Sequence, residues 1–453
     1  MRAEENVLRE ENVLEDAVDI GALLDDGVWS AYQKLATVLA ALAVIFDGCD
    51  IQILGIAIPS LIREWHVARA AFAPVVAIGL AGMALGSPAA GYFGDRYGRR
   101  PALIGCVGIF GLATIATAFT HGLAAVAILR FITGLGAGGA LPNAGALAAE
   151  LAPLRRRAVA VKLTIVCVPL GGMAAGLMAA WILPAHGWRA LYALGGAAPL
   201  LLAAVLWMGL PESPRFLVRR RDSWPRLGRL LNRMGRRVRP GALFQDSAEP
   251  RSARGNYLRA LLAPGLRRDT SGLWIAFFFC LGSIYLVFGW LPAMLAAQTF
   301  SVAATSSGLA AYNFGGVLGV LLWTGLITAF GSRGPMLFGS LAAVASALAI
   351  LAIPAGSGAN LLIWGIGVNG LFANAVQTSM FALAAHIYPA SVRASGVAYA
   401  AAVGRTGAVL ISLAGAAIIQ AGSTAYWCAI AEAMLCACAG LAWVHNHIPA
   451  TAR

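Results

Sequence analysis

Two carboxylates three residues apart, Asp47 and Asp50, occur in the middle of the apolar run 35–61. Residues at this spacing lie on one face of a helix. Each carboxylate would cost about 2.5–3.5 kcal/mol at the centre of a membrane. Carboxylates that take up and release protons at that depth are the simplest device for proton coupling, and we assign both residues to this role. The alternative is a structural pair neutralised by a basic partner.

The composition is typical of a membrane protein. Of the 453 residues, 59% are hydrophobic and 12% are charged. Apolar runs of about 20 residues, each long enough to cross a bilayer as a helix, recur along nearly the whole chain. We therefore predict an all-α integral membrane protein with twelve transmembrane helices in two six-helix halves. The spans are expected at 35–61, 72–93, 101–120, 123–149, 158–183, 188–210, 272–297, 305–330, 335–354, 359–386, 395–420 and 424–444.

The arginines indicate the orientation in the membrane. They follow spans 2, 4, 8 and 10, and fifteen of them lie in the long connector 211–271. By the positive-inside rule, these connectors and both termini are cytoplasmic. Among the alternate connectors, the first is the main exception, because it carries Arg63 and Arg69. The net charge of +13 is therefore topological, and it argues against a nucleic-acid partner.

The chain divides at the long connector. Residues 146–157 align without gaps with 382–393, and parallel six-helix repeats are typical of transporters that rock around a central site. Within the N-terminal tail, 18–29 is expected to form an amphipathic helix on the membrane. The seven cysteines lie in apolar runs and are interpreted as buried hydrophobes. The predicted segments are a cytoplasmic tail 1–34, a half 35–210, the cytoplasmic connector 211–271, a second half 272–444 and a cytoplasmic tail 445–453.

A glycine- and arginine-rich loop, 91–100, follows span 2 and resembles the signature loop of the major facilitator superfamily. Its glycines permit a tight turn, and Asp95 is able to pair with arginines and with a helix N-terminus of the other half when the cytoplasmic side closes. The alternative is an ordinary positively charged loop. In the second half Gly331 replaces the acid, so a weaker clasp is expected there. The gating residues are then Gly91, Asp95, Arg96, Gly98, Arg99, Arg100, Glu150 and Arg157.

Arg130 begins a second motif, 130–139 in span 4, where an unpaired guanidinium at membrane depth is costly. We expect it to pair with Asp47 or Asp50, or to bind a substrate carboxylate; the alternative is a purely structural arginine. Over nearly the whole chain, the sequence resembles the aromatic acid:H+ symporter family. The segments that carry this resemblance are 47–50, 134–143, 150–153, 211–217, 290–292, 388–397 and 404–405.

The resemblance implies proton-coupled uptake of an aromatic carboxylate across a bacterial inner membrane by alternating access. It implies that Asp47 and Asp50 couple protons, and that Arg130 and Arg405 bind the carboxylate, since a guanidinium offers two parallel hydrogen bonds. Polar residues of the central spans are expected to complete the substrate site, although each has a structural alternative as a link between helices. They are Tyr285, Tyr312, Asn313, Asn369, Asn374 and Gln377.

The expected partners are the aromatic acid, protons and the lipid bilayer, with the chain acting as a monomer. No catalytic residue, metal site or cofactor is expected, apart from the proton as coupling ion. Three other functions compete: a porter for a sugar, organic ion or exported metabolite, a membrane receptor that does not transport, and an enzyme. Sugar porters share 211–217, but span 7 lacks their Gln-Gln-x-Ser-Gly motif. An enzyme is disfavoured because no nucleophile–base pair or metal cluster stands out at membrane depth.

Overall fold

The computed structural model describes residues 18–239, 241–246, 257–354, 359–389 and 392–450. Eleven helices in these ranges are long and apolar enough to cross a membrane. One of them, α7 (Leu154–Gly209), is two helices merged across a break at Gly187, where φ is 73° and ψ is −178°. The described residues therefore hold twelve candidate spans, which confirms the predicted number.

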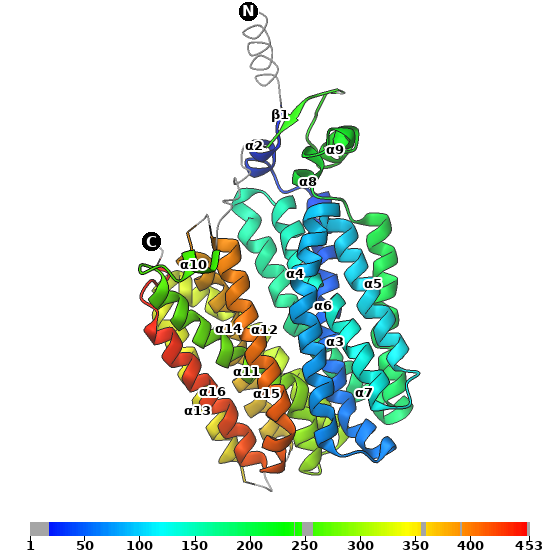
Figure 1. Cartoon of the computed structure of the whole chain (residues 1–453), viewed down its shortest axis with the longest axis vertical. Helices are drawn as coiled ribbons and strands as arrows, with labels where there is room; N and C mark the ends of the chain where they lie inside the picture. Colours follow the sequence, from blue (N-terminus) through cyan, green and yellow to red (C-terminus); the bar gives the residue numbers. More distant parts are fainter. Residues whose placement is uncertain (1–17, 240, 247–256, 355–358, 390–391, 451–453) are drawn as a thin grey trace, which may run out of the picture.

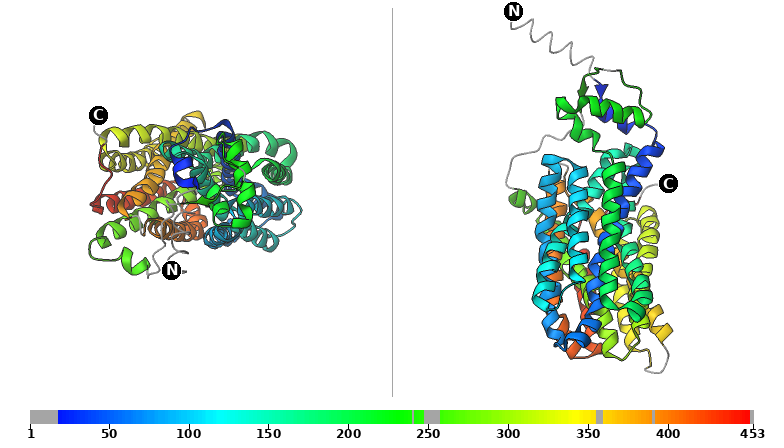
Figure 2. Two further views of the ribbon diagram at one scale, coloured as in Figure 1. Left: turned by 90° about the horizontal axis from the view of Figure 1, so that it is seen from above. Right: turned by 90° about the vertical axis from the view of Figure 1, so that its right-hand side faces the viewer.

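The two halves of the chain form two groups of long helices that lie side by side (Figure 1; Figure 2). The first half supplies α3 (Ala31–Trp65), η1 (Arg69–Phe72), α4 (Ala73–Tyr97), α5 (Arg99–Thr117), α6 (Leu123–Leu151) and α7. The second half supplies α11 (Arg267–Ala297), α12 (Val302–Phe330), α13 (Arg333–Leu351), α14 (Ala359–Ile387), α15 (Arg393–Gln420) and α16 (Ser423–Trp443).

Helix α3 begins four residues earlier than its hydropathy predicts, because a capping box precedes it. The Ser30 hydroxyl accepts a hydrogen bond from the backbone N–H of Gln33 at 3.3 Å, and the Gln33 side chain accepts one from the Ser30 N–H at 2.9 Å. Two orphan donors of the first turn are satisfied in this way. The helix therefore includes a polar first turn, and both aspartates are buried further along it.

Most contacts between long helices lie within one of the two groups, and three pairs of these helices contact each other across the groups. Helix α3 packs along α7 and α4 along α6, while α11 packs along α15 and α12 along α14. Between the groups, α7 contacts α12, α4 contacts α15 and α3 contacts α11. The helices α3, α4, α7, α11, α12 and α15 thus form the boundary between the halves.

A small layer of short elements covers one end of the bundle, which we call the connector end (Figure 1). It contains β1 (Val18–Asp19), α2 (Ile20–Asp25), α8 (Pro214–Val218), η2 (Arg221–Ser223), α9 (Trp224–Arg233) and β2 (Phe244–Gln245), and α10 (Tyr257–Leu261) follows in the connector. Strands β1 and β2 pair in parallel.

The expected membrane-surface helix over 18–29 is wrong. This stretch instead forms β1 and the short α2, and the side chains of Ile20 and Leu24 are buried. They share one apolar cluster with Leu227 and Leu230 of α9. The connector therefore buries the apolar face that the sequence suggested was available to lipid.

Candidate functional site

Asp50 and Arg130 form a buried ion pair between α3 and α6. The Nη1 atom of Arg130 lies 3.2 Å from Oδ2 of Asp50, and the two side chains are 9% and 1% exposed. Thr114 of α5 donates a hydrogen bond to the other carboxylate oxygen at 2.5 Å. Both charges are thus compensated, which is the condition for keeping them away from water. Of the two pairings expected for Arg130, the structure contains the one with Asp50.

Asp47 lies in a different environment, although it precedes Asp50 by less than one helical turn. Its side chain is 2% exposed, and its Oδ1 atom is buried without a hydrogen-bond partner. It lines a cavity together with Arg405 of α15, from the other half of the chain. Arg405 forms no hydrogen bond or ion pair within the part of the chain that the structure describes. Asp50 is therefore paired with Arg130, whereas Asp47 shares a cavity with Arg405 without a bond to it.

Two cavities lie next to each other at this level. The first has a volume of about 30 Å³ and contains Asp50 and Arg130, while the second has about 80 Å³ and contains Asp47 and Arg405. Four residues line both of them and form the partition between them: Ile51, Met83, Ala137 and Tyr285. The first cavity has room for about one water molecule. Two charged sites are therefore separated by a thin layer of mostly apolar side chains.

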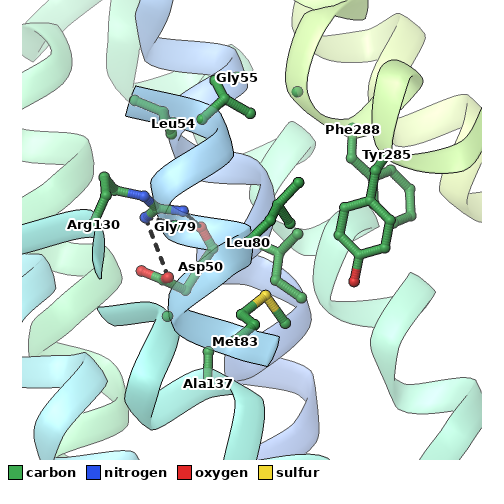
Figure 3. A pocket seen from close by; sticks show the side chains of 14 residues that line it. Asp50, Leu54, Gly55, Gly79, Leu80, Met83, Arg130, Ala137, Tyr285 and Phe288 are labelled. Carbon is green, nitrogen blue, oxygen red and sulfur yellow. Dashed lines mark hydrogen bonds and ion pairs between the residues drawn. The ribbon is translucent and has the colours of Figure 1, made fainter. Parts of the chain in front are cut away.

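Figure 3 shows the first cavity, with the Asp50–Arg130 pair on one side and two aromatic rings of α11 on the other. Tyr285 and Phe288 face the cavity from α11, and Leu80 and Met83 approach them from α4. The rings of Tyr285 and Phe288 contact each other edge to face, with centroids 5.7 Å apart. The apolar wall opposite the ion pair therefore comes from the second half of the chain.

The second cavity combines a cation with amide and hydroxyl groups and aromatic rings. Asn374, Gln377 and Thr378 of α14 line it together with Arg405. Tyr285 and Phe381 supply the rings. Sequence analysis missed Thr378 and Phe381, although Phe381 lies one helical turn after Gln377 and thus on the same face. Such a lining is able to hold an anion with a flat apolar body and polar substituents.

Asn313 was predicted as a substrate ligand. In the structure its side chain forms a contact between the two halves. Its amide group donates to Gln52 Oε1 at 2.7 Å and accepts from Gln52 Nε2 at 3.0 Å. Both side chains are fully buried. Close by, a Cβ on Gly55 would lie 2.4 Å from the carbonyl oxygen of Phe288, so only glycine allows α3 to approach α11 this closely. Asn313 therefore joins α3 to α12.

Two further predicted substrate ligands do not reach either cavity. Asn369 points toward α13, where its amide donates to the Ala343 carbonyl at 2.9 Å and to Ser346 Oγ at 3.0 Å. Tyr312 is fully buried and packs edge to face on Phe288. Neither residue lines the two central cavities, because a polar residue in a central span faces whichever neighbour the rotation of its helix selects.

Within the described residues, the contact that Asp95 forms lies inside the first half and does not join the two halves. Asp95 is 64% exposed and accepts a hydrogen bond from Arg99 at 2.5 Å, within the first half. Arg99 also lies 3.5 Å from Glu150. The Glu212 carboxylate accepts hydrogen bonds from the backbone N–H groups of Arg99 and Arg100, at 2.9 and 3.2 Å. Glu212 was not predicted, and it fixes the start of α5.

The remaining gating residues lie around the same loop. Gly98 ends α4 with a positive φ of 113°, and a Cβ there would meet the Glu212 carboxylate. The Arg96 side chain donates to the Tyr92 hydroxyl at 2.9 Å, and the Arg100 guanidinium donates to the Trp207 carbonyl. A Cβ on Gly91 would meet nothing.

Arg157 binds the N-terminal segment and not the loop. Its guanidinium donates to Asp25 of α2 at 2.5 Å, and Asp25 also lies 3.6 Å from Arg215 of α8. One carboxylate of the acidic segment thus connects the ends of α7 and α8. This connection explains how the segment is held at the connector end.

Gly331, which stands in the second loop where the first loop has an acid, is tightly enclosed. Gly331 has a φ of +76°, and a Cβ there would lie 2.9 Å from the Ile448 carbonyl oxygen. That carbonyl accepts a hydrogen bond from the Ser332 N–H at 2.8 Å, and the Ile448 N–H donates to Ser332 Oγ at 2.9 Å. The C-terminal segment therefore occupies the space that a larger residue at position 331 would need.

The Glu212 carboxylate lies outside the membrane-spanning helices and contacts the loop 91–100. Burial raises the pKa of the Glu212 carboxyl, although hydrogen bonds from the backbone N–H groups of Ser213, Arg100 and Arg99 oppose this effect. The proton affinity of this carboxyl is therefore coupled to the packing of the loop against α8.

Comparison with known proteins shows the family of the chain. The family model described as "Major Facilitator Superfamily" matches residues 40–296. The chain is 36% identical over 408 residues to the gallate transporter of Pseudomonas putida, covering 89% of this chain and 90% of that one. It is 32% identical to the 4-hydroxybenzoate transporter PcaK of Acinetobacter baylyi, covering 89% and 88%.

Solved structures show the same fold. The partially occluded inward-open conformation of the xylose transporter XylE from E. coli superimposes with a TM-score of 0.72. The two sequences are 17% identical, and the match covers 92% of this chain and 99% of that chain. At this identity the likeness concerns the fold, which is the all-α arrangement of two six-helix groups.

Proposed function

The chain belongs to the major facilitator superfamily and groups with its aromatic acid transporters, and on that premise we propose that it imports a hydroxybenzoate-type carboxylate together with protons. The observation that carries the proposal is the cavity between the halves, where the unpartnered Asp47 faces Arg405. In this proposal the membrane is a bacterial inner membrane, and the connector end is cytoplasmic, in keeping with the arginine-rich connectors.

Arg405 is the proposed ligand of the substrate carboxylate, because its fork matches a carboxylate with two parallel hydrogen bonds. The ring of the acid would lie between Tyr285 and Phe381, because aromatic rings attract each other in offset-stacked or edge-to-face arrangements. Gln377, Asn374 and Thr378 would bond the ring hydroxyls, since all of them line the same cavity. The relatives named for gallate and 4-hydroxybenzoate support a hydroxylated ring.

The cavity must enlarge before it holds such an acid. Its volume of about 80 Å³ is below the roughly 300 Å³ of ordinary ligand sites. Because its walls come from both halves, a rocking motion of one half against the other would open it. Gln52 and Asn313, together with the close contact of Gly55 and Phe288, hold the halves together on the side away from the connector.

Asp47 is the proposed first proton acceptor. A bare carboxylate at this depth is costly, and protonation removes that cost. The substrate carboxylate then pairs with Arg405, so the cavity that holds both the proton and the acid has no net charge. A cavity that holds only the proton has a net positive charge, and one that holds only the acid has a net negative charge. Closing the halves around a neutral cavity needs less desolvation energy. Proton and acid therefore favour movement together, which is the requirement of symport.

Asp50 is the proposed second coupling residue and acts through Arg130. A substrate carboxylate that enters the first cavity competes with Asp50 for the Arg130 guanidinium. When Asp50 loses that partner it becomes an unpaired buried charge, and it takes up a proton. The ion pair observed between them is then the resting state of the coupling device.

The decisive experiment is uptake of radiolabelled aromatic acids by cells that express the chain, with and without a protonophore. The panel contains gallate, 4-hydroxybenzoate, protocatechuate and benzoate. We expect protonophore-sensitive accumulation of at least one hydroxylated acid. Absence of uptake of every acid, with the protein present in the membrane, would overturn the substrate class. Uptake that is insensitive to the protonophore would overturn proton coupling alone.

A further inference from the structure

A third cavity lies between the halves at the end of the bundle opposite the connector. Its volume is about 360 Å³, more than four times that of the cavity at Arg405. One wall comes from the last turns of α3 and from η1, and the other comes from α11, α12 and the turn between them. The polar and aromatic residues in its lining are Ser60, Arg63, Arg69, Thr299, Phe300 and Thr305.

Two arginines give this cavity a positive charge that nothing nearby in the described chain neutralises. Arg63 and Arg69 form no ion pair within the described residues, and Nε of Arg69 is buried without a hydrogen-bond partner. The adjacent acid, Glu64, is already engaged: it lies 2.7 Å from Arg189 and accepts a hydrogen bond from Trp188 at 2.6 Å. These arginines are also the main exception to the arginine distribution in the sequence.

The helix on the opposite wall adds to the positive potential. The cavity is lined by Val302 and Thr305, which belong to the first turn of the 29-residue helix α12. The N-terminus of a long helix carries a partial positive charge and favours anions. The apolar part of the lining includes Ile56, Pro59 and the ring of Phe300. The cavity thus offers cations at its edge and an apolar surface beside them.

We propose that this cavity is an outer capture site, which binds the aromatic carboxylate before it reaches Arg405. The proposal rests on the proposed function, because it assigns the same class of substrate to a second place. Arg63 and Arg69 would hold the carboxylate, Phe300 would stack on the ring, and Ser60 or Thr299 would bond a ring hydroxyl. A volume of about 360 Å³ lies in the range of small-molecule sites.

The position of the cavity determines how it would act in transport. It lies beyond the contact of Gly55 with Phe288, on the opposite side from the ion pair of Asp50 and Arg130. It therefore exists while the path to the central cavities is closed at that contact. When the halves separate there, the bound acid is already concentrated at the entrance. Fixed positive charge at an entrance raises the capture rate of anions and makes it depend on ionic strength.

The first test measures binding without transport. Radiolabelled gallate and 4-hydroxybenzoate are titrated onto the purified chain in nanodiscs, in an Arg405→Gln background. We expect residual binding that disappears in Arg405→Gln/Arg63→Gln/Arg69→Gln and persists in Arg405→Gln/Arg63→Lys/Arg69→Lys. The lysine control keeps both positive charges at the cavity and leaves the ion pair of Glu64 with Arg189 intact. No residual binding, or binding indifferent to Arg63 and Arg69, would overturn the capture site while leaving wild-type uptake as evidence for the proposed function.

The second test measures uptake kinetics. In Arg63→Gln/Arg69→Gln, the concentration for half-maximal uptake should rise about tenfold at low salt, because steering is lost. The maximal rate should change less than twofold, and the salt dependence of uptake should weaken. The Arg63→Lys/Arg69→Lys variant keeps the charge and checks that the cavity still folds. Unchanged half-saturation in the Gln variant, or the same rise in the Lys variant, would refute the capture site.

Discussion

Asp47 on α3 and Arg405 on α15 line one cavity from opposite halves of the chain, and neither forms an ion pair within the residues that the structure describes. Three residues further along α3, Asp50 is fully compensated by Arg130 and Thr114. One helix thus presents one satisfied and one unsatisfied carboxylate. An unsatisfied charge at membrane depth is expensive, and its presence opposite an arginine motivates the predictions below.

Asp47→Asn should abolish accumulation against a gradient but preserve exchange. The amide has the shape of the carboxylate and takes up no proton, so the internal concentration should reach only the external one. Counterflow of labelled acid in proteoliposomes should continue, because exchange needs no net proton movement. Retained accumulation in this variant would show that Asp47 is not a coupling residue.

Asp50→Asn should impair stability as well as coupling. It leaves Arg130 as a buried unpaired charge, which costs about 3–5 kcal/mol in comparable pairs. Asp50→Asn/Arg130→Met removes both charges and should recover most of the stability without recovering accumulation. Thermal unfolding in detergent and uptake in cells measure the two effects separately. If the double variant transports normally, the ion pair has only a structural role.

Gln377→Leu should reduce selectivity for hydroxylated acids. The loss of one hydrogen bond of about 0.5–1.5 kcal/mol corresponds to a roughly 2- to 13-fold weaker preference for 4-hydroxybenzoate over benzoate. Asn369→Leu is the matched control, because it changes an amide on the same helix that faces α13. Competition of each acid against labelled uptake gives the ratio. An equal change in both variants would place the hydroxyl contact elsewhere.

Gln52→Ala and Asn313→Ala should be strongly non-additive. Each leaves a buried amide without its partner across the halves, so each single change should cost about 1–3 kcal/mol. The double variant should cost less than the sum, with a coupling energy of about 1 kcal/mol. Unfolding by denaturant in mixed micelles measures the cycle. Additive effects would mean that the pair does not hold the halves together.

Because Glu212 is partly buried, it should make the free energy of unfolding smaller at high pH than at low pH. Its pKa is raised above the ordinary 4.5, so the folded chain binds this proton more readily than the unfolded chain. The stabilisation is therefore present at low pH and is lost as pH rises through the folded pKa. Glu212→Gln keeps an acceptor for the backbone N–H groups and should be at least as stable as wild type at pH 7.

The difference between wild type and Glu212→Gln should then shift in favour of wild type as pH falls toward 4.5. Glu212→Ala, which removes the acceptor, should be less stable than both at every pH. Melting temperatures of the three proteins between about pH 4 and pH 7 provide the comparison. A constant difference between wild type and Glu212→Gln across this range would contradict the raised pKa.

Hydropathy and motifs alone determined the number of spans, the membrane class and the family. Runs of about 20 apolar residues are a one-dimensional signal, because the bilayer imposes its thickness on every helix. The break between spans 5 and 6 was also predicted, and it falls at Gly187. The signal for Asp47, Asp50, Arg130 and Arg405 was equally local, since charge at membrane depth is rare whatever surrounds it.

Tertiary structure alone decided which of these charges meet. Arg130 pairs with Asp50 and leaves Asp47 to face Arg405, because the rotation of α3 is fixed by its packing along α7. In the same way, the packing of α14 and α12 against their own neighbours directs Asn369 toward α13 and Asn313 toward Gln52. In a helix that is apolar on all sides, the sequence contains no periodic pattern that marks the inner face. Close packing of neighbouring helices supplies that information, and only the folded chain contains it.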